Sequence, residues 1–350
     1  MNSDALAGAA PEGPRPPQTA GLGAVRSWDG SSRRIWTIYV LVIYGYLYLC
    51  MFFGGPFTAF DHENYIGFLN QPFPFFFEPG FTALAYLLNM FIGESLRFPL
   101  QFVILTLPPF LLVWSADKRE RSGASGMMLY ACILTKAFYI GFFAQRFFFA
   151  ELWVTALVIR STTRKGLSWK EAMPGLLLHF STLTILPSLV WLRGTFSMRK
   201  LMTGGLFLGI GYIYIMFFSG FQFLGYDYSR YLDGNGPPGG YSLFTIFEMA
   251  VLAMICKVIL PKKDVANFIT LVVLVLIMKM AMGEVEVFSR VFQIQVDLIM
   301  ILAGLWSKRR AELLYFFGFG FFVIQLLFTS ISGELIVFHS TALLNALGFK

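Results

Sequence analysis

The chain of 350 residues is 57% hydrophobic and only 13% charged, and it contains 40 phenylalanines. This composition excludes an ordinary soluble domain. Its many apolar runs of about 20 residues predict an all-α polytopic membrane protein. The net charge of +7 does not indicate nucleic-acid binding, because Lys and Arg of membrane proteins gather in cytoplasmic loops. No phosphate-binding loop and no GxSxG sequence is present, which argues against ATP-driven transport and the common serine hydrolases.

The N-terminal part of the chain sets the expected orientation. Residues 1–32 are rich in Pro, Gly and Ala and predict a disordered cytoplasmic tail, whereas 33–350 form a single transmembrane helical domain. The segment 54–80 carries acidic residues but no Lys or Arg, so we expect it on the outer side. Residues 81–95 are apolar but short for a span, and they predict an interfacial or re-entrant helix.

The other apolar runs alternate across the membrane, with basic loops inside. The predicted spans are 35–53, 98–114, 127–144, 147–159, 201–219, 241–260, 265–282, 291–306 and 312–330. Basic residues flank 172–192 on both sides, so we prefer two short helices that meet near His179 and Thr182 over a single crossing. The total is about ten or eleven spans, with re-entrant or short helices on the outer side.

This topology collects isolated polar residues on the outer face. They are His62, Arg146, His179, Arg230, Arg290 and His339. Positive charge kept outside, against the usual bias, suggests an anionic ligand, since a guanidinium donates two hydrogen bonds to a phosphate. The alternative is that the arginines extend to lipid headgroups. His179 is a candidate general base or ligand donor, and the alternative is a packing histidine.

Two outer loops share a pattern of an Asp followed four residues later by a Tyr, namely Asp61 with Tyr65 and Asp227 with Tyr231. Such a pair can bind a carbohydrate, although an aromatic belt at the membrane interface would contain the same residues. Lys279 is the one charge that lies well inside a predicted span, where it either extends outward to the membrane interface or pairs with Glu284 or Glu286.

The cysteines indicate neither a disulfide framework nor a metal site. Cys50, Cys132 and Cys256 all lie inside apolar runs, so we expect buried thiols.

These motifs resemble the EpsG/Wzy-type polysaccharide polymerases. The resemblance begins with a Q-R pair that opens a helix, Gln145 and Arg146, followed by a basic loop and an H-x-S-x-x-x-x-L-P block that starts at His179. The matching motifs extend over roughly residues 35–310 and occur in the same order as in the family. The further matching positions are Asp61, Tyr65, Glu78, Pro79, Gly80, Tyr228, Tyr231 and Arg290. His62 departs from the family pattern, which has Tyr there.

The resemblance implies a glycosyltransferase on the periplasmic face of a bacterial inner membrane. Such enzymes join oligosaccharide repeat units carried on undecaprenyl diphosphate into an exopolysaccharide, capsule or O-antigen. The resemblance implies that no nucleotide sugar and no ATP are needed. The residues show no pattern of metal ligands, so we expect metal-independent action without a cofactor. A chain-length regulator and a flippase of the same pathway are the expected partners. The expected catalytic residues are His179, Asp61 and Arg290. The expected substrate-binding residues are Gln145, Arg146, Arg290, Tyr65, Glu78, Asp227, Tyr228, Arg230 and Tyr231.

Three rival functions remain open. An O-antigen ligase would use the same diphosphate clamp, but ligases usually carry a much larger outer loop than 220–240. A flippase for the same lipid would line a cavity at mid-membrane with charges. A membrane acyltransferase would need a His and an acid near its acyl donor, usually facing the cytoplasm.

Overall fold

The computed structural model describes the following residues: 26–53, 79–92, 94–116, 125–138, 145–163, 174–175, 177–179, 182, 197–199, 201–206, 241–282, 286–307 and 310–328. Regular secondary structure in these residues is helical, and no strand occurs among them. The predicted all-α class is therefore confirmed for the described part of the chain.

The longer helices are, in chain order, α1 (Arg26–Phe53), α3 (Pro79–Ile92), α4 (Glu94–Ala116), α5 (Gly126–Ala137), α7 (Gln145–Thr163), α12 (Tyr241–Ile259), α13 (Lys262–Met282), α14 (Glu286–Trp306) and α15 (Glu312–Phe328). By length and composition alone, one helical segment of the described residues, Pro99–Ala116, is apolar enough to cross a membrane. Shorter apolar helices cover Pro79–Ile92, Gly126–Ala137 and Phe292–Trp306.

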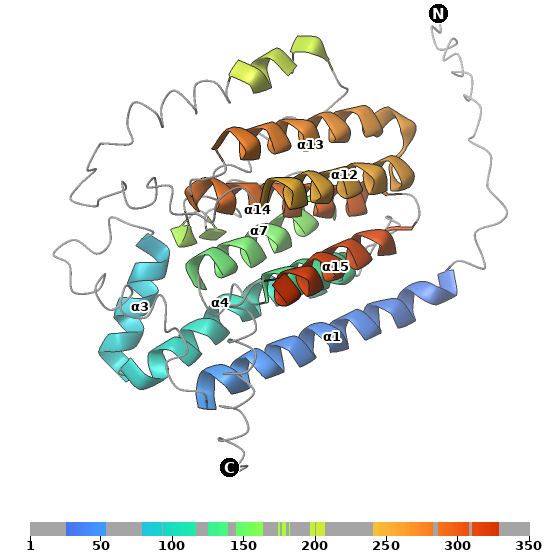
Figure 1. The fold of residues 1–350 in the computed structure, drawn as a ribbon. Coiled ribbons are helices and arrows are strands. Elements are labelled where there is room, and N and C mark those ends of the chain that lie inside the picture. The colour runs from blue at the N-terminus through green and yellow to red at the C-terminus, as the bar shows by residue number, and fades with distance from the viewer. Residues whose placement is uncertain are drawn as a thin grey trace, which may run out of the picture.

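The long helices form one bundle in which neighbours in the chain alternate in direction (Figure 1). Helices α1 and α4 run antiparallel, since Arg33 Nη2 donates to Trp114 O at 2.9 Å and Tyr48 shares a hydrogen bond with Thr106 further along. Helices α4, α7 and α14 begin at the same end of the bundle, and the short helix α3 runs across that end (Figure 1). We call this the α3 end.

Helix α5 is the centre of the bundle, and all of its residues are buried. It contacts α1, α4, α7, α14 and α15. Glycines permit the closest contacts, since a Cβ on Gly318 of α15 would lie 2.6 Å from Cys132 Sγ of α5. The Cys132 thiol donates to Leu314 O at 3.3 Å. Cys132 and Cys256 are both buried free thiols, as predicted.

Several helices begin earlier than the sequence predicts, and in α1 and α14 the extension includes a segment assigned to a tail or a loop. Helix α1 includes 26–32, which the composition assigns to the disordered tail 1–32, so the expected tail is too long. Helix α14 includes Glu286 and Arg290, which the hydropathy pattern places in a loop. Extending an existing helix costs far less than starting one, so polar residues beside an apolar helix join it.

The close approach of α15 to α5 predicts a difference between two glycines of the same helix. Gly318→Ala should destabilise the protein by about 1–3 kcal/mol, because the new methyl group would overlap Cys132 Sγ. Gly320→Ala is the matched control, since a Cβ there meets nothing within 4 Å. Thermal unfolding of both variants in detergent measures the difference. Equal melting temperatures would contradict the packing described here.

Candidate functional site

The α3 end contains two of the arginines that the sequence singles out. Arg146 lies in the first turn of α7, and Arg290 lies in the second turn of α14. Helices α7 and α14 contact each other and begin at the same end (Figure 1). Helix N-termini carry partial positive charge and free N–H groups, which favour an anion at this end. For Gln145 and Arg290 the structure describes the backbone alone.

His179 lies against the first turn of α7. Its ring meets the Phe147 ring edge-on, with 5.7 Å between the centroids and 83° between the planes. Phe147 directly follows Arg146 in the chain, and it is buried. The structure therefore brings His179 next to the turn that carries Arg146, although the two are more than 30 residues apart in sequence.

The backbone around His179 changes its hydrogen-bond spacing. The His179 N–H donates to Gly175 O at 3.2 Å, which is α-helical spacing. The Thr182 N–H then donates to His179 O at 3.2 Å, and the Thr182 hydroxyl donates to the same oxygen at 2.7 Å. The spacing of the hydrogen bonds therefore tightens from four residues to three between His179 and Thr182. The rest of the predicted helix pair in 172–192 lies outside the described residues.

The first turn of α3 closes this site from the side. A Cβ on Gly80 would lie 2.8 Å from Leu177 Cβ and 3.2 Å from Leu177 O, so a larger residue would push the two segments apart. The next residue, Phe81, stacks on Phe149 of α7 with 6.3 Å between the ring centroids. Gly80, Arg146 and His179 come from three separate sequence blocks, and the structure brings these blocks together.

The remaining predicted site residues lie outside the described part of the chain. They are Asp61, Tyr65, Glu78, Asp227, Tyr228, Arg230 and Tyr231, together with His62 and His339. Within the described residues, no group of three or more His, Cys, Asp or Glu side chains is arranged to hold a metal ion.

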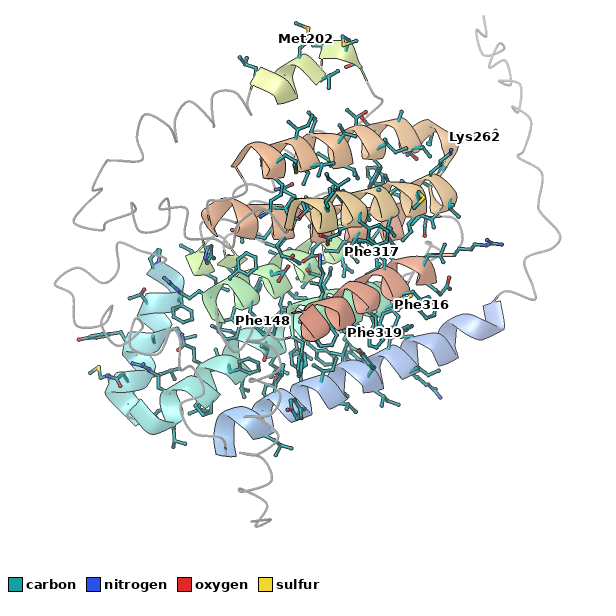
Figure 2. The ribbon with its side chains drawn as sticks, viewed as in Figure 1. Phe148, Met202, Lys262, Phe316, Phe317 and Phe319 are labelled. Atoms are coloured by element: carbon teal, nitrogen blue, oxygen red, sulfur yellow. The ribbon has the colours of Figure 1, made fainter. Side chains whose placement is uncertain are left out.

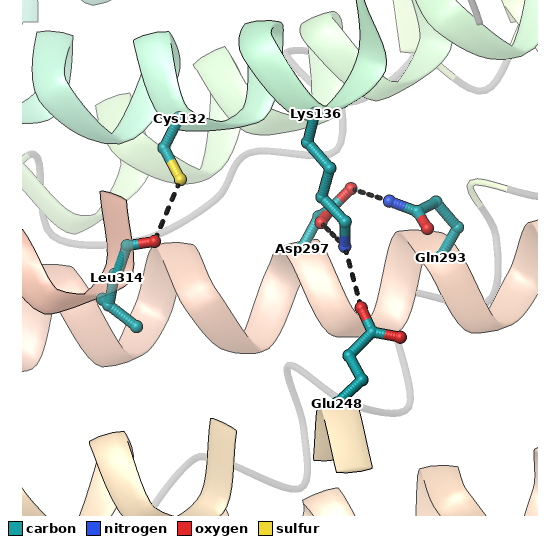
Figure 3. A network of polar contacts seen from close by, with 6 residues as sticks. All are labelled: Cys132, Lys136, Glu248, Gln293, Asp297 and Leu314. Carbon is teal, nitrogen blue, oxygen red and sulfur yellow. Dashed lines mark hydrogen bonds and ion pairs between the residues drawn. The ribbon is translucent and has the colours of Figure 1, made fainter. Parts of the chain in front are cut away.

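A buried ionic network lies in the middle of the bundle (Figure 3). Lys136 Nζ of α5 lies 2.8 Å from Asp297 Oδ1 of α14 and 3.6 Å from Glu248 Oε1 of α12. Gln293 Nε2, one turn before Asp297, donates to Asp297 Oδ2 at 2.9 Å. Lys136, Asp297 and Glu248 are all buried, so the network joins three helices without solvent.

A fourth ionisable residue belongs to this network. Glu151 of α7 is 2% exposed and lies within electrostatic reach of Lys136 and Asp297. Neither of its carboxylate oxygens has a hydrogen-bond partner. The network thus contains three acids and one base, so full ionisation would leave uncompensated negative charge among apolar helices.

This network corrects the expectation that Lys279 is the one charge deep inside a span. Lys279 is only partly buried, and its ammonium lies 5.6 Å from the centre of the Phe292 ring. Lys136, Glu151 and Asp297 are far more buried. The signal was present in the sequence, because each is a single charge inside an apolar run.

The network lies directly inward of the α3 end. Glu151 follows Arg146 by five residues on α7, which is about 7.5 Å along the helix axis. Asp297 follows Arg290 by seven residues on α14, about 10 Å along the axis. Arg290, Gln293 and Asp297 have the spacing of one helix face. The bundle therefore carries buried ionisable residues on α7 and α14 inward of its α3 end.

Comparison of the chain with protein-family models, with curated proteins and with solved structures finds no match in any of the three. The functional argument therefore depends on the geometry of the chain itself.

The ion pair predicts strong coupling between two helices. Lys136→Met should destabilise the protein by about 3–5 kcal/mol, because it leaves buried carboxylates without their base. Adding Asp297→Leu to Lys136→Met should recover part of the lost stability. The double variant no longer buries the Asp297 carboxylate without its lysine partner. Lys257→Met on the exposed face of α12 is the control. Unfolding of the single and double variants in detergent measures the coupling, and simple additivity would argue against the pair.

Proposed function

We propose that this chain is a membrane glycosyltransferase that polymerises lipid-linked oligosaccharide repeat units. The observation that carries the proposal is the meeting of three separate sequence blocks at the α3 end, represented by Gly80, Arg146 and His179. A chance resemblance of short motifs would not require these blocks to be neighbours in space. Their contacts support the family resemblance independently of the motifs.

The distribution of polar and apolar side chains supports a membrane location. Large apolar side chains cover the outside of the bundle, among them Val42 at 64%, Met202 at 71% and Phe316 at 67% exposure (Figure 2). Charged side chains such as Lys136 and Asp297 lie inside. In water, the exposed apolar side chains and the buried charges would each destabilise the folded protein. A lipid bilayer favours this arrangement instead.

The basic residues support an orientation with the α3 end outside. The opposite end of the bundle carries the start of α1, the start of α13 and the turn before α15 (Figures 1 and 2). The basic residues of these three segments include Arg33, Arg34, Lys262, Lys263 and Arg310. Positive loops favour the cytoplasm, so the N-terminus would be cytoplasmic and the site periplasmic, in the inner membrane of a bacterium. About ten or eleven crossings follow if the remaining apolar runs also span.

The proposed reaction transfers a glycan from one lipid carrier to another. The acceptor hydroxyl oxygen forms a bond to the anomeric carbon of the donor glycan. The bond from that carbon to the diphosphate oxygen breaks, and its electron pair leaves with undecaprenyl diphosphate. Arg146, Arg290 and the N-terminus of α7 would stabilise the charge that develops on the diphosphate. The acceptor proton would pass to His179 or to Asp61.

The proposed substrate is an undecaprenyl-diphosphate-linked oligosaccharide, and the product is a capsule, exopolysaccharide or O-antigen chain. The outer-loop residues Tyr65, Glu78, Asp227, Tyr228, Arg230 and Tyr231 are the proposed sugar-binding residues. No nucleotide and no metal are needed for this chemistry. A chain-length regulator and a flippase of the same pathway are the proposed partners, and ligation to a lipid core is the alternative use of the same site.

The buried network favours a second candidate function. Charges at depth in a helix bundle are typical of transporters, so Lys136, Glu151, Glu248 and Asp297 are compatible with a flippase for the same lipid. Purified protein in liposomes with the lipid-linked repeat unit separates the two functions. Formation of a glycan ladder without added nucleotide supports the polymerase, whereas movement of the lipid between leaflets without a ladder supports the flippase.

The diphosphate clamp predicts a specific loss of polymerisation. Arg146→Gln should slow ladder formation by about 10- to 150-fold, which corresponds to the loss of a charged hydrogen bond worth about 1.5–3 kcal/mol. Arg146→Lys should recover part of the rate, because it keeps the charge but not the two-pronged geometry. Arg34→Gln, at the other end of the bundle, is the matched control. An unchanged rate in Arg146→Gln would exclude the clamp.

A proton-accepting role for His179 predicts a changed pH profile. His179→Gln should lower the rate by about 10²- to 10⁴-fold and remove the rate change between about pH 5 and 8. Phe147→Leu is the control for packing, since it removes the ring against which His179 lies but leaves the imidazole. If both variants lower the rate equally and keep the wild-type pH profile, His179 is a packing residue.

A further inference from the structure

Helix α4 carries a buried polar pair at the α3 end that the sequence analysis did not single out. Arg97 lies in its first turn and is 2% exposed, and Gln101 lies one turn later and is 1% exposed. The spacing of four residues places both side chains on the same helix face. Arg97 is among the largest fully buried side chains of the described residues.

This pair lies at the level of the site already described. The Phe102 ring lies 5.8 Å from Phe148 and 5.5 Å from Phe149, so the third turn of α4 lies beside the start of α7. Arg97 precedes Phe102 by about 7.5 Å along α4, and Arg146 precedes Phe148 by about 3 Å along α7. The two arginines therefore lie within about one helical turn of the same level, at the end where α3 crosses.

The side-chain amide of Gln101 is buried without any hydrogen-bond partner. Neither Gln101 Nε2 nor Gln101 Oε1 has a hydrogen-bond partner. Burying an amide without partners destabilises the folded state, and native proteins rarely do so without compensation. A ligand with an oxyanion and a hydroxyl group would satisfy it, because Nε2 donates and Oε1 accepts. Arg97 supplies a permanent positive charge beside it.

We propose that Arg97 and Gln101 form a second wall of the ligand site, opposite Arg146, and bind the diphosphate of the lipid carrier. Arg97 donates to phosphate oxygens. Gln101 Nε2 donates to a phosphate oxygen, and Gln101 Oε1 accepts from the first sugar hydroxyl. The identity of this ligand rests on the proposed function, whereas the anion-binding pair itself does not.

The test measures binding by the purified full-length protein in detergent, with farnesyl diphosphate as the probe and farnesol as the uncharged comparison. Arg97→Gln should weaken farnesyl diphosphate binding at least tenfold, and Arg97→Lys should weaken it less. Gln101→Leu should weaken it about tenfold. Arg34→Gln should bind as the wild type does. Farnesol binding should be the same in all variants, because it lacks the oxyanion.

A second measurement distinguishes a ligand-binding residue from a structural one. Gln101→Leu should raise the melting temperature without ligand, since it removes a buried amide that has no partner and keeps a similar volume. A structural role for Gln101 would instead lower the melting temperature. Wild-type affinity for farnesyl diphosphate in Gln101→Leu and Arg97→Lys would overturn the proposal, and so would a lower melting temperature of Gln101→Leu.

The outcome is separable from that of the polymerase proposal. If the wild-type protein forms no glycan ladder but the Arg97 and Gln101 variants lose farnesyl diphosphate binding, the diphosphate site stands and the polymerase proposal fails. If the wild-type protein forms a ladder and the variants bind farnesyl diphosphate as well as it does, the proposed role of Arg97 and Gln101 is wrong and the polymerase proposal stands.

Discussion

The ion pair between Lys136 and Asp297 is the constraint on which the arrangement of this bundle depends. A lysine in a helix that is buried on every side must have acidic partners, and α12 and α14 supply them. The pair therefore sets the rotation of α14 about its own axis. Arg290 precedes Asp297 by seven residues on α14, so the same rotation also fixes the helix face on which the backbone position of Arg290 lies. A buried ion pair contributes little net stability by itself. It can still fix the position of a residue about 10 Å away along the same helix.

The burial of α5 also explains the unusual outside of the protein. The charged residues of the network on α5, α7, α12 and α14 are buried, and many of the exposed side chains of the bundle are Leu, Ile, Met and Phe. Glycines at positions such as Gly318 let neighbouring helices approach α5 closely, so close packing adds to the polar contacts that join these helices. This combination is consistent with a bundle that lies in lipid.

The α3 end combines close packing with polar groups that have no partner. Gly80 and Phe81 hold α3 against the His179 segment and α7, while the Gln101 amide lies nearby without a hydrogen bond. Glu151 repeats this feature one level deeper, where its carboxylate faces the ionic network. Unsatisfied buried polar groups reduce stability, and they are most easily understood where function requires them. Among the described residues, Gln101 on α4 and Glu151 on α7 are two such groups, and Gln101 lies nearer the α3 end.

The amino-acid sequence by itself determined the helical class and most helix bounds, because apolar runs of fixed length and basic flanks are local properties. It also singled out Arg146 and His179, since each is an isolated polar residue beside an apolar run. Only the tertiary structure joined Lys136 to Asp297 and Glu248, and placed Arg97 and Gln101 beside the α7 terminus. Those pairings connect helices far apart in the chain. A lone charge in an apolar run shows that a partner is needed, but the packing of the helices decides which residue it is.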